Sequence, residues 1–391
     1  MKIAIKGATV YTVTKGIIKR GTVLVDKGKI AAVGEDLTIP KGYTVINGAG
    51  KFLFPGLVEA HCHVGNCGEG NGSIVIDDNE KTNPITPAIR ALDGINPLDM
   101  AFGDARQYGI TTICVLPGSG NVIGGWGVVL RTVGTILDEM IIPGGKAGLK
   151  AAFGENPKVV YSEQKRCPSS RMGIALVMRE AWVKALEYKR RLALGKKDPT
   201  KAPERDLALE ALLLVLEGKE TLRCHAHNAY DIVTAIRIAR EFGYKLTLEH
   251  CTEGHLITEF LVREKIYCSI GPSAGHRSKV ELREMKYATC GILEKAGVKL
   301  TITTDAPVIS IQYLPNCAGW AIRDGMSEAG ALRAITINPA EVLGLAKRKG
   351  SIEVGKDADL GLWDGLPFDA TSSCHLTLID GEIVWEKSVK K

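Results

Sequence analysis

Two histidines separated by one residue are the first side chains whose spacing suggests chemistry. His61 and His63 lie in the stretch PGLVEAHCHVG, residues 55–65, at the end of an apolar run. The run predicts a buried strand, and side chains two apart on a strand point to the same face. Both imidazoles can therefore bind one metal ion. Cys62 would point to the opposite face, which favours a small buried side chain over a metal ligand.

Several later segments place further polar side chains at or just beyond the end of a predicted strand. They are Lys150 and Glu155 in GLKAAFGEN, His225 and His227 in LRCHAHN, His250 in LTLEHC, His276 in SIGPSAGHRSKVEL and Asp305 in LTITTDAP. A lone histidine on an apolar face is usually a hydrogen-bonded core residue. Several histidines that converge with a carboxylate are instead typical ligands of Zn²⁺, and also suit Fe²⁺, Mn²⁺ or Co²⁺.

The middle of the chain alternates predicted strands and helices, which would position these side chains. The predicted strands are 53–64, 109–118, 148–154, 221–227, 245–251, 266–272 and 300–307. The predicted helices are 98–108, 171–193, 206–217, 229–242, 255–263, 280–296 and 328–335. Repeated βα units favour an α/β fold, a parallel (β/α)8 TIM barrel, over an open sheet. In that barrel the carboxyl ends of the strands form the active-site mouth.

The two ends of the chain have a different pattern. Both read as short strands separated by turns that contain glycine. We predict that residues 1–54 and 346–391 pair into one small β-sandwich domain, with the barrel in residues 55–345.

Composition and charge exclude several classes of protein. The chain has 391 residues, a net charge of +6 and 45% hydrophobic residues, which is ordinary for a globular protein. Basic residues gather in 184–205, which predicts the solvated face of a helix and a charged turn, not a nucleic-acid surface. The pattern indicates neither a membrane span nor a signal peptide. Ten cysteines without a CxxC pair suggest reduced thiols and a cytoplasmic protein.

Taken together, the motifs resemble those of the metal-dependent amidohydrolase superfamily. PGLVEAHCHV resembles its signature Pro-Gly-(Leu/Phe)-(Ile/Val)-(Asp/Glu)-x-His-x-His, and LRCHAH, LTLEHCTEG and TTDAPV resemble its later ligand strands in the same order. GSIEVGKDADLGLWDG and LIDGEIVW resemble its C-terminal β-domain. The resemblance covers essentially the whole chain and points to the imidazolonepropionase-like branch, which also contains prolidase-type dipeptidases.

The resemblance implies a role for each matching residue. His61 and His63 match the metal ligands of the first barrel strand, His225 that of the fifth, His250 that of the sixth and Asp305 that of the eighth. In the family the aspartate contacts the metal and accepts a proton from the attacking water. Asp305 and His250 are therefore the predicted catalytic residues.

The ligand from the fourth strand stays open between two residues. Strand parity puts Lys150 and Gly154 on one face, and Glu155 falls on the other unless the chain turns after Gly154. Family members use either a carboxylated lysine that bridges two metals, or a glutamate, or neither. We favour Lys150 as a bridging carbamate and keep Glu155 as the alternative, so one or two ions remain possible.

Three further residues are predicted to bind the substrate. His227 shares its face with His225 and would orient substrate or a ligand, unless it is a structural histidine. His276 and Arg277, with Lys279, could bind an anionic group, unless this loop only caps the next helix.

Two loops are expected near the mouth. The polar segment 69–87 would shape specificity, and the glycine-rich stretch 117–127 fits neither a P-loop nor a dinucleotide fingerprint, which favours a loop over the pocket.

We therefore expect a metal-dependent hydrolase of a carbon–nitrogen bond in an amide or cyclic amide, other than an ordinary peptide bond. Asp305 would act as general base toward an activated water. The alternatives are a prolidase-type dipeptidase, a deaminase or a phosphotriesterase on the same barrel, and a non-catalytic scaffold, against which the complete ligand set argues. Expected partners are a small-molecule substrate and, by resemblance, further copies of the chain, but no nucleic acid and no membrane.

Overall fold

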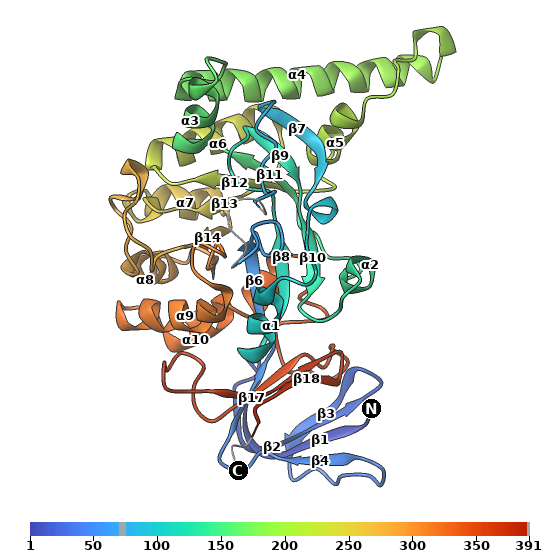
Figure 1. Ribbon diagram of the computed structural model, residues 1–391, viewed down its shortest axis with the longest axis vertical. Helices are drawn as coiled ribbons and strands as arrows, with labels where there is room; N and C mark the ends of the chain where they lie inside the picture. The colour runs from blue at the N-terminus through green and yellow to red at the C-terminus, as the bar shows by residue number, and fades with distance from the viewer. Residues whose placement is uncertain (70–75, 389–391) are drawn as a thin grey trace.

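The computed structural model describes residues 1–69 and 76–388. The strands from the two chain ends lie together at one end of the molecule, and the long helix α4 lies at the other (Figure 1). Residues 70–75 of the predicted loop 69–87 lie outside the described residues, so its role in specificity stays a prediction.

The strands from both chain ends form one eight-stranded sheet, and this confirms the small β-sandwich domain. Its strands are β1 Ile3–Tyr11, β2 Ile17–Asp26, β3 Lys29–Glu35, β4 Thr44–Asn47, β5 Phe52–Pro55, β16 Leu360–Trp363, β17 Cys374–Ile379 and β18 Glu382–Glu386. β5 pairs antiparallel with β16, which joins the two ends of the chain. Buried aliphatic side chains, among them Ile5, Val23 and Leu378, form its core. The limits at residues 54 and 346 stay a prediction.

The other strands form the barrel. They are β6 Leu57–Cys62, β7 Ile85–Arg90, β8 Ile110–Val115, β9 Ile123–Trp126, β10 Val128–Arg131, β11 Leu149–Ala152, β12 Leu222–Ala226, β13 Leu246–His250, β14 Cys268–Ile270 and β15 Leu300–Ile302. β11 to β15 are parallel neighbours in chain order, and β6 is parallel to β8. The last strand closes on the first, because Thr303 Oγ1 donates to His61 O at 2.6 Å and His63 N donates to Ala306 O at 2.7 Å.

One barrel position differs from the expected parallel order. β9 runs antiparallel to β11 and β10 runs antiparallel to β8, so the glycine-rich segment contributes strand as well as loop. A Cβ at Gly125 would lie 2.4 Å from Ile89 O, so only glycine allows β7 to approach here. Because glycine has no side chain, this strand does not show the alternation of apolar and polar residues by which strands are predicted.

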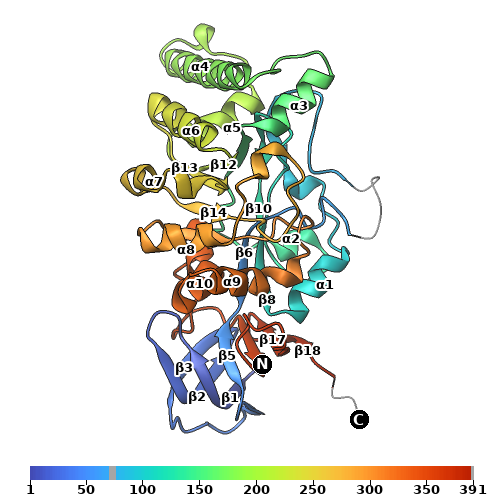
Figure 2. The same ribbon diagram turned by 90° about the vertical axis from the view of Figure 1, so that its left-hand side faces the viewer.

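Helices cover the outside of the barrel (Figure 2). They are α1 Met100–Gln107, α2 Leu137–Met140, α3 Glu155–Glu163, α4 Arg171–Gly195, α5 Leu207–Leu216, α6 Ala229–Phe242, α7 Thr258–Glu264, α8 Ala288–Lys295, α9 Leu314–Arg323, α10 Glu328–Ala334 and α11 Ile337–Val342. α6 ends at Gly243, whose φ of +74° suits a glycine cap. The predicted helix 280–296 is interrupted: a single 3₁₀ turn, Val280–Leu282, precedes α8.

The basic segment 184–205 lies on the second half of α4 and the turn after it, and its lysines and arginines are exposed, as predicted. Within residues 1–69 and 76–388, none of the helices combines the length and apolar character needed to span a bilayer.

Candidate metal centre

The ends of β6 and β15 bring together His61, His63 and Asp305, which we name the first ligand group. Asp305 Oδ1 lies 3.3 Å from His61 Nε2 and 3.1 Å from His63 Nε2. All three potential ligand atoms lie within 4.8 Å of one another. Cys62 points elsewhere, with its Sγ 3.5 Å from Cys114 O. Strand parity therefore placed the two imidazoles correctly on one face.

Glu59 ties β6 to the segment that follows β15, below the first ligand group. Its Oε1 accepts a hydrogen bond from His61 N at 3.0 Å, and its Oε2 accepts from the backbone N and the Oγ1 of Thr304, both at 2.8 Å. Burial raises the pKa of this carboxyl to about 7. Because Thr304 directly precedes Asp305, Glu59 fixes the spacing between the ligand strands.

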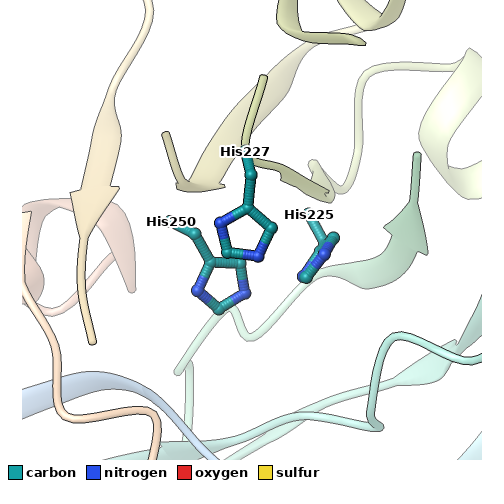
Figure 3. Close-up of side chains that lie close together, drawn as sticks. All are labelled: His225, His227 and His250. Carbon is teal, nitrogen blue, oxygen red and sulfur yellow. The ribbon is translucent and has the colours of Figure 1, made fainter. Parts of the chain in front are cut away.

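The second ligand group consists of His225, His227 and His250, at the ends of β12 and β13 (Figure 3). Ring centroids lie 4.4 Å apart for His225 and His250, 4.6 Å for His225 and His227, and 4.9 Å for His227 and His250. Their potential ligand atoms lie within 4.8 Å of one another. His225 and His227 share a face by strand parity. The φ of +73° at His250 marks a turn of the chain there, after Glu249 has already pointed into the barrel.

Three imidazoles have one nitrogen fixed by an acceptor. These contacts are His61 Nδ1 to Glu249 Oε2 at 2.8 Å, His63 Nδ1 to Leu116 O at 2.7 Å and His250 Nδ1 to Gly271 O at 2.7 Å. A carbonyl or carboxylate oxygen only accepts, so each Nδ1 donates, and Nε2 is the nitrogen of each ring that is left to bind a metal ion. His227 Nδ1 lies 2.7 Å from the hydroxyl of Thr252, which can accept in the same way.

His225 differs from the other four histidines. Neither of its ring nitrogens has a hydrogen-bond partner among the described residues, although His225 is only 2% exposed. Burial, with His250 nearby, lowers the pKa of His225 well below its ordinary value, so the ring is neutral and offers a lone pair. Burial also lowers the pKa of His227 strongly and that of His250 to about 3.

These donors fit a divalent cation. Five imidazoles and one carboxylate converge at the mouth of the barrel, and burying the ring of His225 without a partner for its nitrogens would cost free energy. Such nitrogen and oxygen donors suit the divalent ions named above.

Lys150 lies inside the barrel beside the first ligand group. Its Nζ is 3.4 Å from His61 Nε2 and donates to Pro117 O at 3.1 Å. Burial lowers the pKa of Lys150, against the carboxylates of Asp305 and Glu249, which raise it. A buried amine of lowered pKa is the form that can carry a carbamate.

The alternative residue, Glu155, begins α3 after Gly154, whose φ is +93°. Its backbone N donates to Glu281 Oε2 at 2.9 Å, and its side chain lines the cavity described below. Of the two candidates, Lys150 is the one that contacts a predicted metal ligand.

A buried ion pair between Arg223 and Glu249, which we did not predict, holds the ring of His61. Arg223 Nε lies 2.5 Å from Glu249 Oε1 and its Nη2 lies 3.0 Å from Glu249 Oε2, with both side chains at most 1% exposed. Burial alone would raise the pKa of Glu249, but Arg223 and His61 hold it well below its ordinary value. Parity with His225 was the signal that could have found Arg223.

A second unpredicted carboxylate faces the second ligand group. Glu281 Oε1 lies 3.9 Å from His225 Nε2, 3.7 Å from His227 Nε2 and 2.8 Å from Lys279 Nζ. Glu281 is 1% exposed. Its position inside the predicted helix 280–296 gave no sign that it faces the mouth.

The two ligand groups open into a cavity of about 530 Å³, a size that suits a small molecule. His63, His225, His227 and Asp305 form part of its wall. The other polar residues that line it are Asp78, Asn79, Lys81, Ser119, Glu155, Asn156, Ser278 and Lys279.

His276 and Arg277 lie outside this cavity, which corrects their expected place. They line a separate surface depression with Tyr287, and Arg277 Nη2 donates to Met285 O at 3.3 Å. After β14 the chain lines the cavity at Pro272, and it lines the cavity again from Ser278 and Lys279. Lys279 therefore reaches the cavity, and the two basic residues before it do not.

Comparisons with known proteins agree with this geometry. The model of the Amidohydrolase family matches residues 184–384. A solved structure of an amidohydrolase from Thermotoga maritima MSB8 is 44% identical and covers 99% of this chain and 100% of its own, with a TM-score of 0.95.

More distant relatives match as well. Amidohydrolase tasK of Hapsidospora irregularis is 27% identical over 94% of this chain, and the chain spans only 40% of the length of tasK. An imidazolonepropionase from Geobacillus sp. (strain WCH70) is 25% identical over 89% of this chain and 84% of its own length.

Proposed function

This chain belongs to the amidohydrolase family, and from that premise we propose that it hydrolyses a carbon–nitrogen bond in a small amide or cyclic amide. The observation that carries the proposal is the convergence of five imidazoles and Asp305 at one barrel mouth. The residues that would hold a divalent ion are His61, His63 and Asp305, with the second ligand group beside them. Such an ion supplies Lewis acidity, which makes water more acidic and polarises a carbonyl bond.

Asp305 is the general base of the proposed reaction. Its Oδ1 faces His61 and His63, and its Oδ2 lies 4.0 Å from His250 Nδ1. Although burial opposes ionisation, His250, His61 and His63 hold the pKa of Asp305 well below its ordinary value, so the carboxylate is ready to accept a proton from water. The proton that Asp305 accepts can then pass to the leaving nitrogen, which is a stronger base than a carboxylate.

His250 fits the role of a ligand better than that of an acid. Its Nδ1 donates to Gly271 O, so its Nε2 has no proton to give to a substrate. The additional catalytic role predicted for His250 stays a prediction.

A metal assay followed by a substrate screen tests the proposal. The purified chain is analysed for bound metal, loaded with Zn²⁺, Mn²⁺ or Co²⁺, and assayed on cyclic amides, N-acyl amino acids, dipeptides, aminated purines and pyrimidines, and phosphotriesters. We expect turnover in the first two classes, strongly reduced turnover in Asp305→Asn, and unchanged turnover in Asp369→Asn, which alters an exposed aspartate in the loop after β16.

Each contrary result identifies an alternative. Turnover restricted to dipeptides, aminated bases or phosphotriesters would replace the proposed reaction by a dipeptidase, a deaminase or a phosphotriesterase. A chain that binds none of these metals would be a scaffold, and the proposal would be wrong.

A further inference from the structure

We propose that the second ligand group is a cation site of its own, in which His227 and Glu281 are ligands beside His225 and His250. A second ion would then not depend on a carbamate at Lys150. This inference rests on the proposed function, since it assumes that the mouth binds divalent metal.

The spacing of the atoms supports four ligands around one ion. A tetrahedral zinc with bonds of about 2.0–2.1 Å keeps its ligand atoms roughly 3.4 Å apart. Glu281 Oε1 lies 3.7 Å from His227 Nε2 and 3.9 Å from His225 Nε2, so these pairs need to close by only a few tenths of an ångström. The potential ligand atoms of His225, His227 and His250 lie within 4.8 Å of one another, and Figure 3 shows the three side chains gathered close together.

The orientation of the rings points the same way. His250 Nδ1 is bound to Gly271 O and His227 Nδ1 contacts Thr252 Oγ1, so in each ring Nε2 is the nitrogen left to bind an ion. His225 has no hydrogen-bond partner among the described residues.

Glu281 places another acceptor opposite these nitrogens. The distances of 3.7 and 3.9 Å are too long for a hydrogen bond from His227 or His225 to the carboxylate. Two imidazole nitrogens and a carboxylate oxygen therefore meet at this distance without a hydrogen bond between them, and a cation between them would be bound by all three.

Glu281 is held in place from outside the group. Its Oε2 accepts from Glu155 N at 2.9 Å, and Lys279 Nζ lies 2.8 Å from its Oε1 while donating to Asn156 Oδ1 at 2.8 Å. A carboxylate oxygen has two lone pairs, so Oε1 can contact Lys279 and a metal ion together. The carboxylate is thus positioned before any ion binds.

Lys150 contacts the first ligand group, not the second. Its Nζ contacts His61 Nε2 and Pro117 O, and no hydrogen bond among the described residues joins it to the second ligand group. The second group therefore has enough donors without a modified lysine.

Counting bound ions in three variants tests this inference. Wild type, Lys150→Met, His227→Gln and Glu281→Gln are stripped with chelator, titrated with Zn²⁺ and with Co²⁺, and analysed by elemental analysis and visible Co²⁺ absorption. We expect two ions in wild type and in Lys150→Met. In His227→Gln and Glu281→Gln the second ion should bind more than about 100-fold more weakly, which exceeds the roughly 10–100-fold effect of an outer partner.

The control variant is Glu284→Gln, which changes a carboxylate three residues along the same loop and should keep both ions. Circular dichroism verifies that each variant folds, and the two ligand variants provide independent tests if one of them does not. The inference is overturned if Lys150→Met loses one ion while Glu281→Gln and His227→Gln keep two, or if wild type binds only one. A wild type without any ion would instead contradict the proposed function.

Discussion

The first and second ligand groups offer similar donor atoms but are held in different ways. In the first group, His61 Nδ1 is hydrogen-bonded to Glu249, which forms an ion pair with Arg223. Asp305 contacts both histidines of this group. The second group has a hydroxyl and a carbonyl as its ring partners, and His225 has no partner among the described residues. Buried charges therefore hold His61 before a cation arrives, whereas the three rings of the second group have only neutral partners or none.

The largest expected effect follows from the carboxylate within the first group. Asp305→Asn keeps the size of the side chain but removes the base, so kcat should fall by about 10²–10⁴-fold. Most of the metal should remain, because the histidines are untouched. Steady-state kinetics and elemental analysis of the same preparation measure both quantities. Retained activity on a confirmed substrate would show that the base lies elsewhere.

The next effect tests the charges below the first group. Arg223→Met removes the charged partner of the buried Glu249 and leaves it only His61 and Thr247, which should reduce the free energy of unfolding by about 3–5 kcal/mol. Arg179→Met is the control, because it breaks the half-exposed pair between Arg179 and Glu241 and should cost at most about 1 kcal/mol. Urea unfolding followed by circular dichroism compares them. Equal losses would mean that the buried pair has no special role.

Strand parity predicted much of the site, because it depends only on alternation along a strand. It placed His61, His63, His225 and His227 correctly on the inner face. The same rule could have found Arg223, two residues before His225. Parity was less useful beyond the strand ends.

The features that were missed depend on tertiary structure. The apolar pattern of 280–296 resembles a helix, but the chain makes a single turn at Val280–Leu282 that buries Glu281 against the histidines. β9 was hidden because Gly124 and Gly125 have no side chain to reveal alternation. His276 and Arg277 were expected at the cavity but lie in a surface depression. The path of the loop that follows β14 cannot be inferred from its residue types.

A double variant separates the stability of the first group from its affinity for metal. Arg223→Met with Glu249→Gln leaves no unpaired buried charge, so most of the stability lost in Arg223→Met should return. His61 then has only a neutral acceptor, and the affinity of the first ion should fall by about 10–100-fold. Chelator competition measures that affinity. If the double variant binds the first ion as tightly as wild type, the charge of Glu249 does not contribute to metal binding by His61.

The smallest effect tests the neutral partner in the second group. Thr252→Val removes the hydroxyl 2.7 Å from His227 Nδ1 and keeps the shape of the side chain. His227 then loses a hydrogen bond worth about 1 kcal/mol, so the second ion should bind roughly fivefold more weakly while the first is unaffected. Thr258→Val, which removes a hydroxyl bound to His255 O away from both groups, is the control and should change neither affinity.

The direction of this small effect sharpens the comparison between the groups. If His227 is a ligand, its ring must hold one orientation when the ion binds, and Thr252 is the side chain that fixes it. If His227 contacts substrate instead, Thr252→Val should raise KM and leave both ion affinities as they are. Titration with Co²⁺ and measurement of KM on the same variant therefore distinguish a His227 that binds the second ion from a His227 that contacts only the substrate.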